Sequence, residues 1–348
     1  MKRILWLCIA GLLSACSGSS LKEDETVIFF PTSAHMKDDG SWSVPIHHWI
    51  FEKEEGDISR KLTQKVLSEV LEKLGVSEEQ ASSPLTKKRL MWFLVDNEKN
   101  KEVDVLLDGK AETLSQSAPN GHAKTMLSLT AEDAKKYQKQ GGWVSIKAQD
   151  PFNRGFSGEI QLIPETGVSV ISDIDDTIKI SGVLNKKALI KNTFAKPYEA
   201  TSGFPEYYKK MQEKGAFFHY VSASPWQLYP SLKPFMQANY PKGTISLRNF
   251  RIKDSSFIAF LKSSEEYKVK QIGNIINRYP KHQFILIGDS GEHDPEVFTR
   301  IYKQYPENVK SIQLRVIKGS KMEEKRFNKL FVTAPKRLWE IYAVPNKS

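Results

Sequence analysis

The chain contains very little cysteine. Its 348 residues include only two cysteines, Cys8 and Cys16, and both lie near the start. Disulfide frameworks, cysteine nucleophiles and cysteine-ligated zinc sites all need thiols in the folded part of a protein. We therefore expect the chain after Cys16 to fold and act without any of them.

The start of the chain carries an apolar run that is too short to cross a membrane. Met1-Lys2-Arg3 is basic, the run from Ile4 to Leu13 is apolar, and small residues follow it. A spanning helix needs about 20 apolar residues, whereas a basic start and a short apolar core are typical of a signal peptide. We predict that residues 1–15 are such a signal for export.

The end of this signal, Leu13-Ser14-Ala15-Cys16, resembles the lipobox of bacterial lipoproteins. The resemblance implies lipid on Cys16, with residues 16–25 as a flexible linker to this anchor; the alternative is an ordinary secretory signal. Ser17, where aspartate would retain a lipoprotein, implies sorting to the outer membrane. The expected location is the bacterial cell envelope, lipid-anchored and facing the periplasm.

Acidic residues are outnumbered by basic ones. Lysine and arginine total 51 against 41 for aspartate and glutamate, which gives a formal charge of +10. A basic balance favours anionic partners, namely nucleic acid, phosphoesters or acidic lipid headgroups. Because an exported protein does not meet nucleic acid, we expect no nucleic-acid partner.

Residues 26–164 are predicted to form a small β-rich, sandwich-like domain. Turn residues separate apolar stretches that are typical of strands, and one helical insertion interrupts them. The expected strands are Val27–Phe30, Trp42–Ile46, Met91–Val95, Val103–Leu107, Trp143–Lys147 and Glu159–Ile163. The insertion has one apolar face, made by Ile58, Leu62, Val66, Val70 and Leu71. The sequence does not indicate a protein partner for this domain.

Residues 165–348 are predicted to form an α/β domain with a mostly parallel sheet, because strands alternate with amphipathic helices. The expected strands are Val168–Ile171, Phe217–Val221, Phe284–Ile287 and Ile312–Ile317. Two helices are expected from their apolar faces. The first face consists of Phe204, Tyr207, Tyr208 and Met211, and the second of Ile272, Ile275, Ile276 and Tyr279.

Polar residues follow these strands at the points where parallel sheets bind ligands. The three stretches are Asp173-Ile174-Asp175-Asp176-Thr177, Ser222-Ala223-Ser224 and Gly288-Asp289-Ser290-Gly291-Glu292-His293-Asp294. A carboxylate can attack phosphorus, and Asp173, nearest the strand end, is our candidate nucleophile. Asp175, two residues on, faces the same side of an extended chain and is the candidate general acid and base. Asp176 should face away, as an exposed turn residue or as hydrogen-bonding support.

A phosphoryl group needs hydroxyl and ammonium donors to match its charge. Ser222 is the expected hydroxyl donor, with Ser224 as the weaker candidate. The candidates for the ammonium group are Lys262, Lys268 and Lys270. Lys268 is preferred because it lies four residues before Ile272, on the buried face of its helix. The alternative for Lys268 is a side chain whose charged end reaches solvent.

Magnesium is usually held by one or two carboxylates together with waters and phosphate. Asp173 and Asp289 supply that number, and the backbone carbonyl of Asp175 is a further candidate ligand. Asp294 is expected either to serve this site or to cap a helix, since Pro295 follows it. The histidines are scattered, so a histidine metal site is not expected.

The order of these motifs resembles the haloacid dehalogenase superfamily. They are Asp173-x-Asp175-x-Thr177, then Ser222, then Lys268, then Gly288-Asp289 with Asp294. The resemblance implies a Rossmann-like catalytic domain in which Thr177 belongs to the catalytic set. An aspartate at position 175 resembles the phosphatase branch of the superfamily.

Three longer stretches are closer to one family. "SDIDDTIKISGV", "FHYVSASPWQLYP" and "FILIGDSGEHDPEVF" resemble the catalytic domain of the actin-patch-associated phosphatidate phosphatases, densely over residues 167–316 and loosely over 26–345. The resemblance implies magnesium-dependent hydrolysis of phosphatidate, an anionic phospholipid, through an aspartyl-phosphate. One departure is Tyr267 before Lys268, where the family often has histidine. A phosphatase for a soluble monoester and a non-catalytic envelope scaffold remain the alternatives.

Overall fold

The computed structural model describes residues 21–52, 65, 68–69, 71–73, 75–138, 141–249, 265–317, 324–332 and 334–342. The expected signal peptide with Cys16 lies outside the described residues, as does Lys262. The same holds for most of the expected helical insertion, namely Ile58, Leu62, Val66 and Val70. Leu71, the remaining residue of its apolar face, is fully buried.

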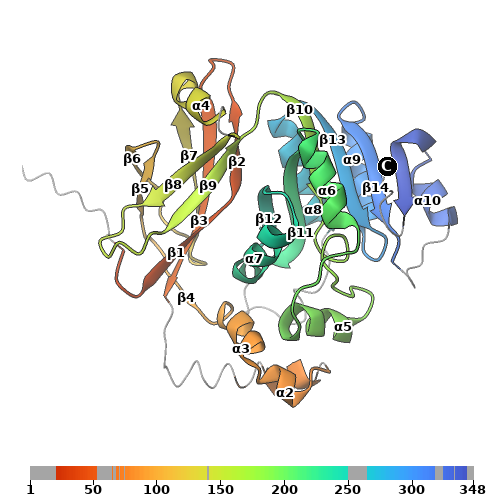
Figure 1. The fold of residues 1–348 in the computed structure, drawn as a ribbon, viewed down its shortest axis with the longest axis horizontal. Helices are drawn as coiled ribbons and strands as arrows, with labels where there is room; N and C mark the ends of the chain where they lie inside the picture. The colour runs from red at the N-terminus through yellow and green to blue at the C-terminus, as the bar shows by residue number, and fades with distance from the viewer. Residues whose placement is uncertain are drawn as a thin grey trace, which may run out of the picture.

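The first part of the chain forms a nine-stranded, mostly antiparallel sheet with the order β1-β3-β2-β9-β8-β5-β6, in which β4 and β7 also pair with β3 (Figure 1). The strands are β1 (Glu25–Phe30), β2 (Thr32–Met36), β3 (Trp42–Glu52), β4 (Asp96–Asn97), β5 (Asp104–Leu107), β6 (Lys110–Thr113), β7 (His122–Leu129), β8 (Trp143–Ala148) and β9 (Ser157–Leu162). Within the described ranges, the helices that accompany them are α2 (Glu78–Ala81), α3 (Pro84–Met91) and α4 (Ala131–Gln138). Inward residues from both halves of the sheet, such as Val44 and Val144, share one apolar core.

The prediction of a strand over Met91–Val95 is wrong. Met91 ends helix α3, and a turn follows it. The helix begins there because the Ser83 hydroxyl accepts a hydrogen bond from the Thr86 amide at 3.2 Å and Pro84 occupies the first turn. The apolar run beyond it, including Trp92 and Phe93, is buried as a helix end and turn. A short, fully buried apolar run does not distinguish these states from a strand.

The second part of the chain forms a six-stranded sheet with the order β12-β11-β10-β13-β14-β15, and every pair of neighbours is parallel. The strands are β10 (Thr166–Ser172), β11 (Phe217–Pro225), β12 (Thr244–Arg248), β13 (Lys281–Asp289), β14 (Val309–Arg315) and β15 (Trp339–Tyr342). The expected mixed α/β architecture with a parallel sheet is therefore confirmed. The strand order reverses at β10, the position where open α/β sheets form a ligand crevice.

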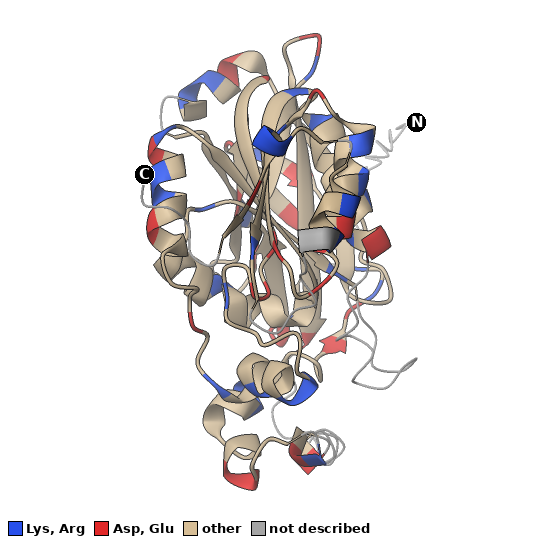
Figure 2. Cartoon of the chain, turned by 90° about the vertical axis from the view of Figure 1, so that its right-hand side faces the viewer, with Lys and Arg blue, Asp and Glu red and all other residues tan. Residues whose placement is uncertain are grey.

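Helices connect the parallel strands and cover the sheet (Figure 1). They are α5 (Lys186–Ile190) with a π-helical continuation to Ala195, α6 (Phe204–Glu213), α7 (Tyr229–Asn239), α8 (Glu265–Arg278), α9 (Asp294–Gln304) and α10 (Glu324–Leu330). The predicted apolar faces of α6 and α8 are buried in the structure, through residues such as Tyr208 and Ile272. Figure 2 shows lysines and arginines on the helices of this part of the chain.

The two sheets pack against each other through aromatic residues. The ring of Phe30 at the end of β1 lies 4.3 Å from that of Trp226 and 5.0 Å from that of Tyr229, measured between centroids. The Tyr279 hydroxyl, next to α8, donates a hydrogen bond to the carbonyl of Ala34 at 3.1 Å. Among the described helices, none has the length and apolar character needed to cross a membrane.

Candidate functional site

Asp173 lies at the carboxyl end of β10, where the strand order reverses. Its amide donates a hydrogen bond to the carbonyl of Ile287 on β13 at 2.9 Å, which holds the residue between the two central strands. The Thr177 hydroxyl donates to Asp173 Oδ2 at 3.1 Å. Both residues are buried, so the carboxylate is held in a fixed place at the mouth of the sheet.

Lys268 projects from α8 into the same place. Its Nζ lies 2.8 Å from Asp173 Oδ1, 2.5 Å from Asp294 Oδ1 and 3.6 Å from a carboxylate oxygen of Glu292. Burial lowers the pKa of Lys268, but Asp173 and the other carboxylates outweigh it, so the pKa lies well above the usual value. Lys270 is exposed, whereas Lys268 reaches the carboxylates. The alternative, a charged end that reaches solvent, is wrong because the side chain is only 2% exposed.

Asp289 and Asp294 complete a group of buried carboxylates. Asp289 Oδ1 accepts hydrogen bonds from the amides of Gly291 at 2.6 Å and Glu292 at 3.2 Å. Its Oδ2 is buried and has no hydrogen-bond partner among the described residues. Asp294 is the first residue of α9, after the cap position at His293, so the prediction that Asp294 caps this helix is wrong by one residue. Its carboxylate turns inward, where Oδ2 accepts the amide of Asp289 at 3.1 Å.

This carboxylate group has the composition of a site for a hard divalent cation. One oxygen from each of Asp173, Asp289 and Asp294 lies within 4.8 Å of the others. Burial raises the pKa of Asp173 and of Asp289 well above the usual value. The neighbouring Asp294 carboxylate raises both pKa values further. The unpartnered Oδ2 of Asp289 needs a cation or a proton. These residues therefore fit Mg²⁺, which prefers carboxylate oxygens.

The Asp175 carboxylate lies in a separate set of contacts. Ser222 Oγ and Ser224 Oγ donate to its Oδ2 at 2.9 and 2.8 Å. Lys179 Nζ lies 2.9 Å from Oδ1, and Ser181 Oγ donates to the same oxygen at 2.7 Å. Burial raises the pKa of Asp175, but Lys179 and the hydroxyl donors outweigh it and hold the pKa below the usual range. The Asp175 carboxylate thus contacts Lys179 and serine hydroxyls. The backbone carbonyl of Asp175 remains a predicted ligand of the metal.

Lys179 and Ser181 were not predicted from the sequence. The chain turns tightly after β10, since the amide of Ile178 donates to the carbonyl of Ile174 at 3.0 Å, and this turn returns both side chains to Asp175. Lys179 could have been predicted from its position four residues after Asp175. That spacing brings two side chains together only if the segment forms a helical turn.

Asp176 supports this turn. Its carboxylate accepts hydrogen bonds from the amides of Ser181, Gly182 and Val183 at 2.8, 2.9 and 2.6 Å. It is 4% exposed and has a left-handed φ of 55°, a conformation that aspartate tolerates better than most residues. The expectation of hydrogen-bonding support is confirmed, and that of an exposed turn residue is wrong.

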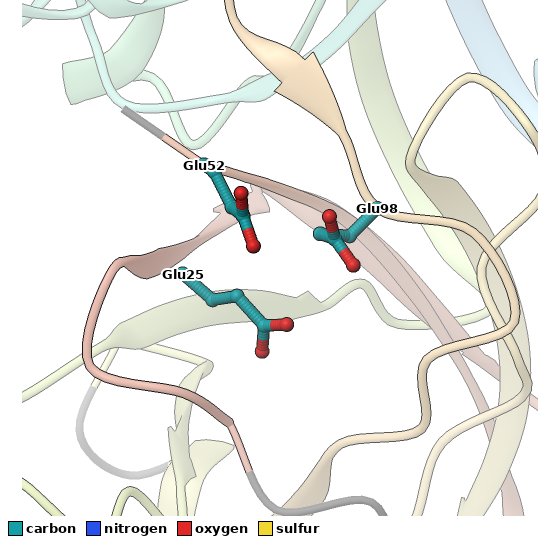
Figure 3. Close-up of side chains that lie close together, drawn as sticks. All are labelled: Glu25, Glu52 and Glu98. Atoms are coloured by element: carbon teal, nitrogen blue, oxygen red, sulfur yellow. The ribbon is translucent and has the colours of Figure 1, made fainter. Parts of the chain in front are cut away.

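A second acidic group, Glu25, Glu52 and Glu98, lies in the antiparallel sheet (Figure 3). Lys101 Nζ contacts Glu25 Oε1, and Lys22 Nζ lies 3.3 Å from Glu52 Oε1. The lysines offset much of the negative charge, so this group is explained as an ion-pair network of the sheet.

Residues 168–316 match the sequence model of the family described as "Phosphatidate phosphatase APP1, catalytic domain". This stretch contains Asp173, Lys268, Asp289 and Asp294, so the resemblance predicted from the motifs is confirmed over these residues. The match begins after the antiparallel sheet, whose last strand ends at Leu162.

Two relatives each match about half of this chain. "Phosphatidate phosphatase APP1" of Saccharomyces cerevisiae is 35% identical over 175 residues, which are 49% of this chain and 29% of the relative. "Uncharacterized protein C29B5.04c" of Schizosaccharomyces pombe is 27% identical over 185 residues, 52% of this chain and 30% of the relative. The chain thus spans less than a third of the length of either relative. A solved structure, a class C acid phosphatase from Bacillus anthracis with tungstate bound, aligns with 49% of this chain and 79% of its own at 13% identity and a TM-score of 0.27.

Proposed function

We propose that the chain is a phosphatase for phosphate monoesters in which Asp173 is the nucleophile. The observation that carries the proposal is the position of its buried carboxylate between Lys268 and Thr177, at the strand-order reversal of a parallel sheet. The all-parallel order and the place of Asp173 after β10 also support a haloacid dehalogenase-like fold for this part of the chain.

In the first step, a carboxylate oxygen of Asp173 attacks the phosphorus atom and the bond to the ester oxygen breaks. Water then attacks the phosphorus of the aspartyl-phosphate, which releases phosphate and restores the carboxylate. Lys268 stays charged because its pKa is raised, and it offsets the charge of the transferred group. We propose that Ser222 Oγ, which donates to Asp175 Oδ2 at 2.9 Å in the free protein, donates to the same group when substrate is bound.

Asp175 is the group that handles protons in this scheme. Because its pKa is lowered, the carboxylate is ionised in the free protein and suits the second step, in which it takes the proton of the attacking water. In the first step the leaving oxygen takes a proton from Asp175, once this carboxylate has taken one up from solvent or from the attacking water of the previous turnover. The contact with Lys179 opposes this uptake.

We further propose that Mg²⁺ is held by Asp173, Asp289 and Asp294, with the carbonyl of Asp175 as an added ligand. When bound, the ion would offset the negative charge of the phosphate oxygens and of the clustered carboxylates. The chain's own residues prepare this place: the two backbone amides that bind Asp289 Oδ1 leave its Oδ2 directed to the site.

Phosphatidate is the proposed substrate, because the relative from Saccharomyces cerevisiae carries that activity in its name. The test measures phosphate release from phosphatidate in mixed micelles and from p-nitrophenyl phosphate, with Mg²⁺ and with chelator. We expect Mg²⁺-dependent release from phosphatidate that Asp173→Asn abolishes, while Asp24→Asn, at an exposed aspartate just before β1, serves as the matched control.

Two other results would change the proposal. Release from the soluble ester alone would keep the chemistry and remove the lipid substrate. No release from either ester by a folded protein would favour the scaffold alternative.

We also propose that Cys16 carries a lipid anchor that places the protein in the bacterial envelope, close to a phospholipid substrate. Fractionation with radiolabelled palmitate tests this: the wild type should be labelled and sediment with outer membranes, whereas Cys16→Ala should be unlabelled. An unlabelled wild type in the soluble periplasm would instead indicate an ordinary secretory signal.

A further inference from the structure

A second pocket, of about 390 Å³, lies where the two sheets meet. Its lining comes from β2, β3 and β7 on one side and from β11, β12 and α8 on the other. Two hydrogen bonds join the sides: the amide of Ile245 donates to the carbonyl of Pro31 at 3.3 Å, and Arg278 Nη1 donates to that of Ser33 at 3.4 Å. The walls are therefore held in place without a ligand.

The charges in this pocket are of one sign. Its described lining contains Lys124 from β7 and Arg278 from α8, and it contains no carboxylate. Of the ion pairs formed by the described residues, none includes either of these two cations. Lys124 is exposed as a whole residue. Partial burial lowers the pKa of its ammonium group, and the nearby positive charges of Arg278 and Lys270 lower it further. Like charges that line one pocket without a carboxylate partner among the described residues are stabilised by a bound anion.

One face of α8 adds neutral donors beside these charges. Gln271, Asn274 and Arg278 are three and four residues apart, so they share one side of the helix, and all three line the pocket. Lys268 reaches the catalytic carboxylates instead, and none of Asp173, Asp175, Asp289 and Asp294 lines the pocket. The pocket is thus separate from the catalytic centre but built on the same helix.

We propose that this pocket binds a phosphate-bearing anion, with Arg278 and Lys124 as the charged donors and the amides of Gln271 and Asn274 as neutral ones. A guanidinium offers paired N–H groups that match two phosphate oxygens, and an ammonium adds a compact charge. The phosphate can come from a small soluble phosphate compound or from the headgroup of an anionic phospholipid. This inference does not depend on the chain being a phosphatase.

The first experiment titrates the full-length protein with inorganic phosphate by calorimetry in the presence of EDTA. Lys124→Gln and Arg278→Gln should each weaken binding about tenfold or more, because a hydrogen bond to a charged group contributes about 1.5–3 kcal/mol. Lys233→Gln, an exposed lysine of α7 outside this pocket, is the matched control and should leave binding unchanged. Arg278→Lys should retain part of the affinity, and circular dichroism checks that each variant is folded.

Asp173→Asn separates this pocket from the catalytic centre. Binding that Asp173→Asn leaves unchanged and that the pocket variants weaken supports the proposal, whatever the outcome of the activity assay. Binding that changes in Asp173→Asn but not in Lys124→Gln and Arg278→Gln belongs to the catalytic centre and overturns it.

A second titration distinguishes the two sources of phosphate. It uses monomeric dihexanoylphosphatidylglycerol, with dihexanoylphosphatidylcholine as the zwitterionic control. Tighter binding of the anionic lipid than of inorganic phosphate, lost in the pocket variants, identifies a lipid headgroup, while binding of phosphate alone identifies a soluble ligand. If the wild type binds neither probe, or if Lys124→Gln and Arg278→Gln bind both as the wild type does, the proposal is wrong.

Discussion

At the scale of single residues, the position of Lys179 ties the acidic loop to the chemistry. This lysine is 3% exposed, and its Nζ lies 2.9 Å from Asp175 Oδ1 and 2.5 Å from Ser181 Oγ. Removing its charge would leave the Asp175 carboxylate without its main counter-charge and held by serine hydroxyls. The orientation of Asp175 toward Ser222 and Ser224 therefore depends on Lys179.

We predict that Lys179→Met lowers kcat for a phosphate monoester by at least about tenfold, since a positioned proton-transfer group contributes roughly 10²- to 10⁴-fold. The KM should change less, because Lys268 and the metal-type carboxylates are untouched. Lys186→Met, at an exposed lysine of α5, is the matched control and should keep full activity. Wild-type kcat in a folded Lys179→Met protein would show that the contact is only structural.

Gly288 is a second residue on which the site depends. A Cβ atom at this position would lie 2.4 Å from Asp294 Oδ2 and 2.8 Å from Asp294 Cγ. The Asp294 carboxylate can approach the backbone of β13 only because residue 288 has no side chain, and this approach also brings Asp294 to Lys268.

We predict that Gly288→Ala displaces the Asp294 side chain, lowers phosphatase activity at least about tenfold and costs roughly 1–3 kcal/mol of unfolding free energy, as overpacked cores do. Gly273→Ala in α8 is the control, because its Cβ would meet only the Tyr305 hydroxyl at 3.3 Å. Activity and urea unfolding measured on both proteins test the prediction, which fails if the two substitutions behave alike.

At the scale of single elements, β3 and β7 bury histidines against one another. His47 Nε2 and His122 Nδ1 are 3.1 Å apart, and both ring nitrogens of His48 are buried without a hydrogen-bond partner among the described residues. Burial lowers the pKa of His48 to about 4 and, with smaller effects of His48 and Lys124, that of His122 to about 3. These strands therefore hold their histidines in the neutral form.

The consequence is a loss of stability in acid. Above about pH 6.5 these histidines are neutral in both states, so they add no pH dependence. As the pH falls below 6.5, the unfolded chain binds protons that the folded protein does not, and the free energy of unfolding falls until the pH reaches the folded-state pKa. Each such histidine should cost about 2 kcal/mol between pH 7 and pH 5.

Urea unfolding at pH 7 and pH 5 checks this for His48→Phe. The variant should lose about 2 kcal/mol less than the wild type over this interval, because one depressed histidine has been removed. His293→Gln, at an exposed histidine before α9, serves as the control. An equal loss in wild type and His48→Phe would mean that His48 is protonated in the folded protein.

Individual strands and helices also show which parts of the fold could be predicted from the sequence. Strands β10, β11, β13 and β14 were expected because each is an apolar run, and polar motif residues follow the first three. The faces of α6 and α8 repeat with helical spacing. Strands β12 and β15 were not expected, since their short sequences around Ser246 and Glu340 resemble loops and gain their state only from parallel partners. Site residues that directly follow a strand, such as Asp173 and Asp289, could be predicted from the sequence. Lys179 was not predicted, because a turn after β10 brings it to Asp175.

At the scale of the whole molecule, adjacent residues of β1 serve two different cores. Phe29 packs inside the antiparallel sheet, whereas Phe30 packs with Trp226 and Tyr229 of the parallel-sheet part. Alternation along a strand predicts that neighbours face opposite sides, but the sequence does not say which side meets another sheet. For that reason the sequence did not predict that the two sheets pack against each other.

This arrangement predicts different outcomes for two similar substitutions. Phe29→Ala and Phe30→Ala should each cost about 3–5 kcal/mol, because each removes a buried aromatic ring. Phe30→Ala removes the ring contacts with Trp226 and Tyr229, so amide hydrogen exchange in α7 should accelerate in that variant well before global unfolding. In Phe29→Ala the protection of α7 should fall only as far as global stability does. Equal protection of α7 in both variants would mean that Phe30 does not couple the two sheets, and that the pocket between them is held by its hydrogen bonds alone.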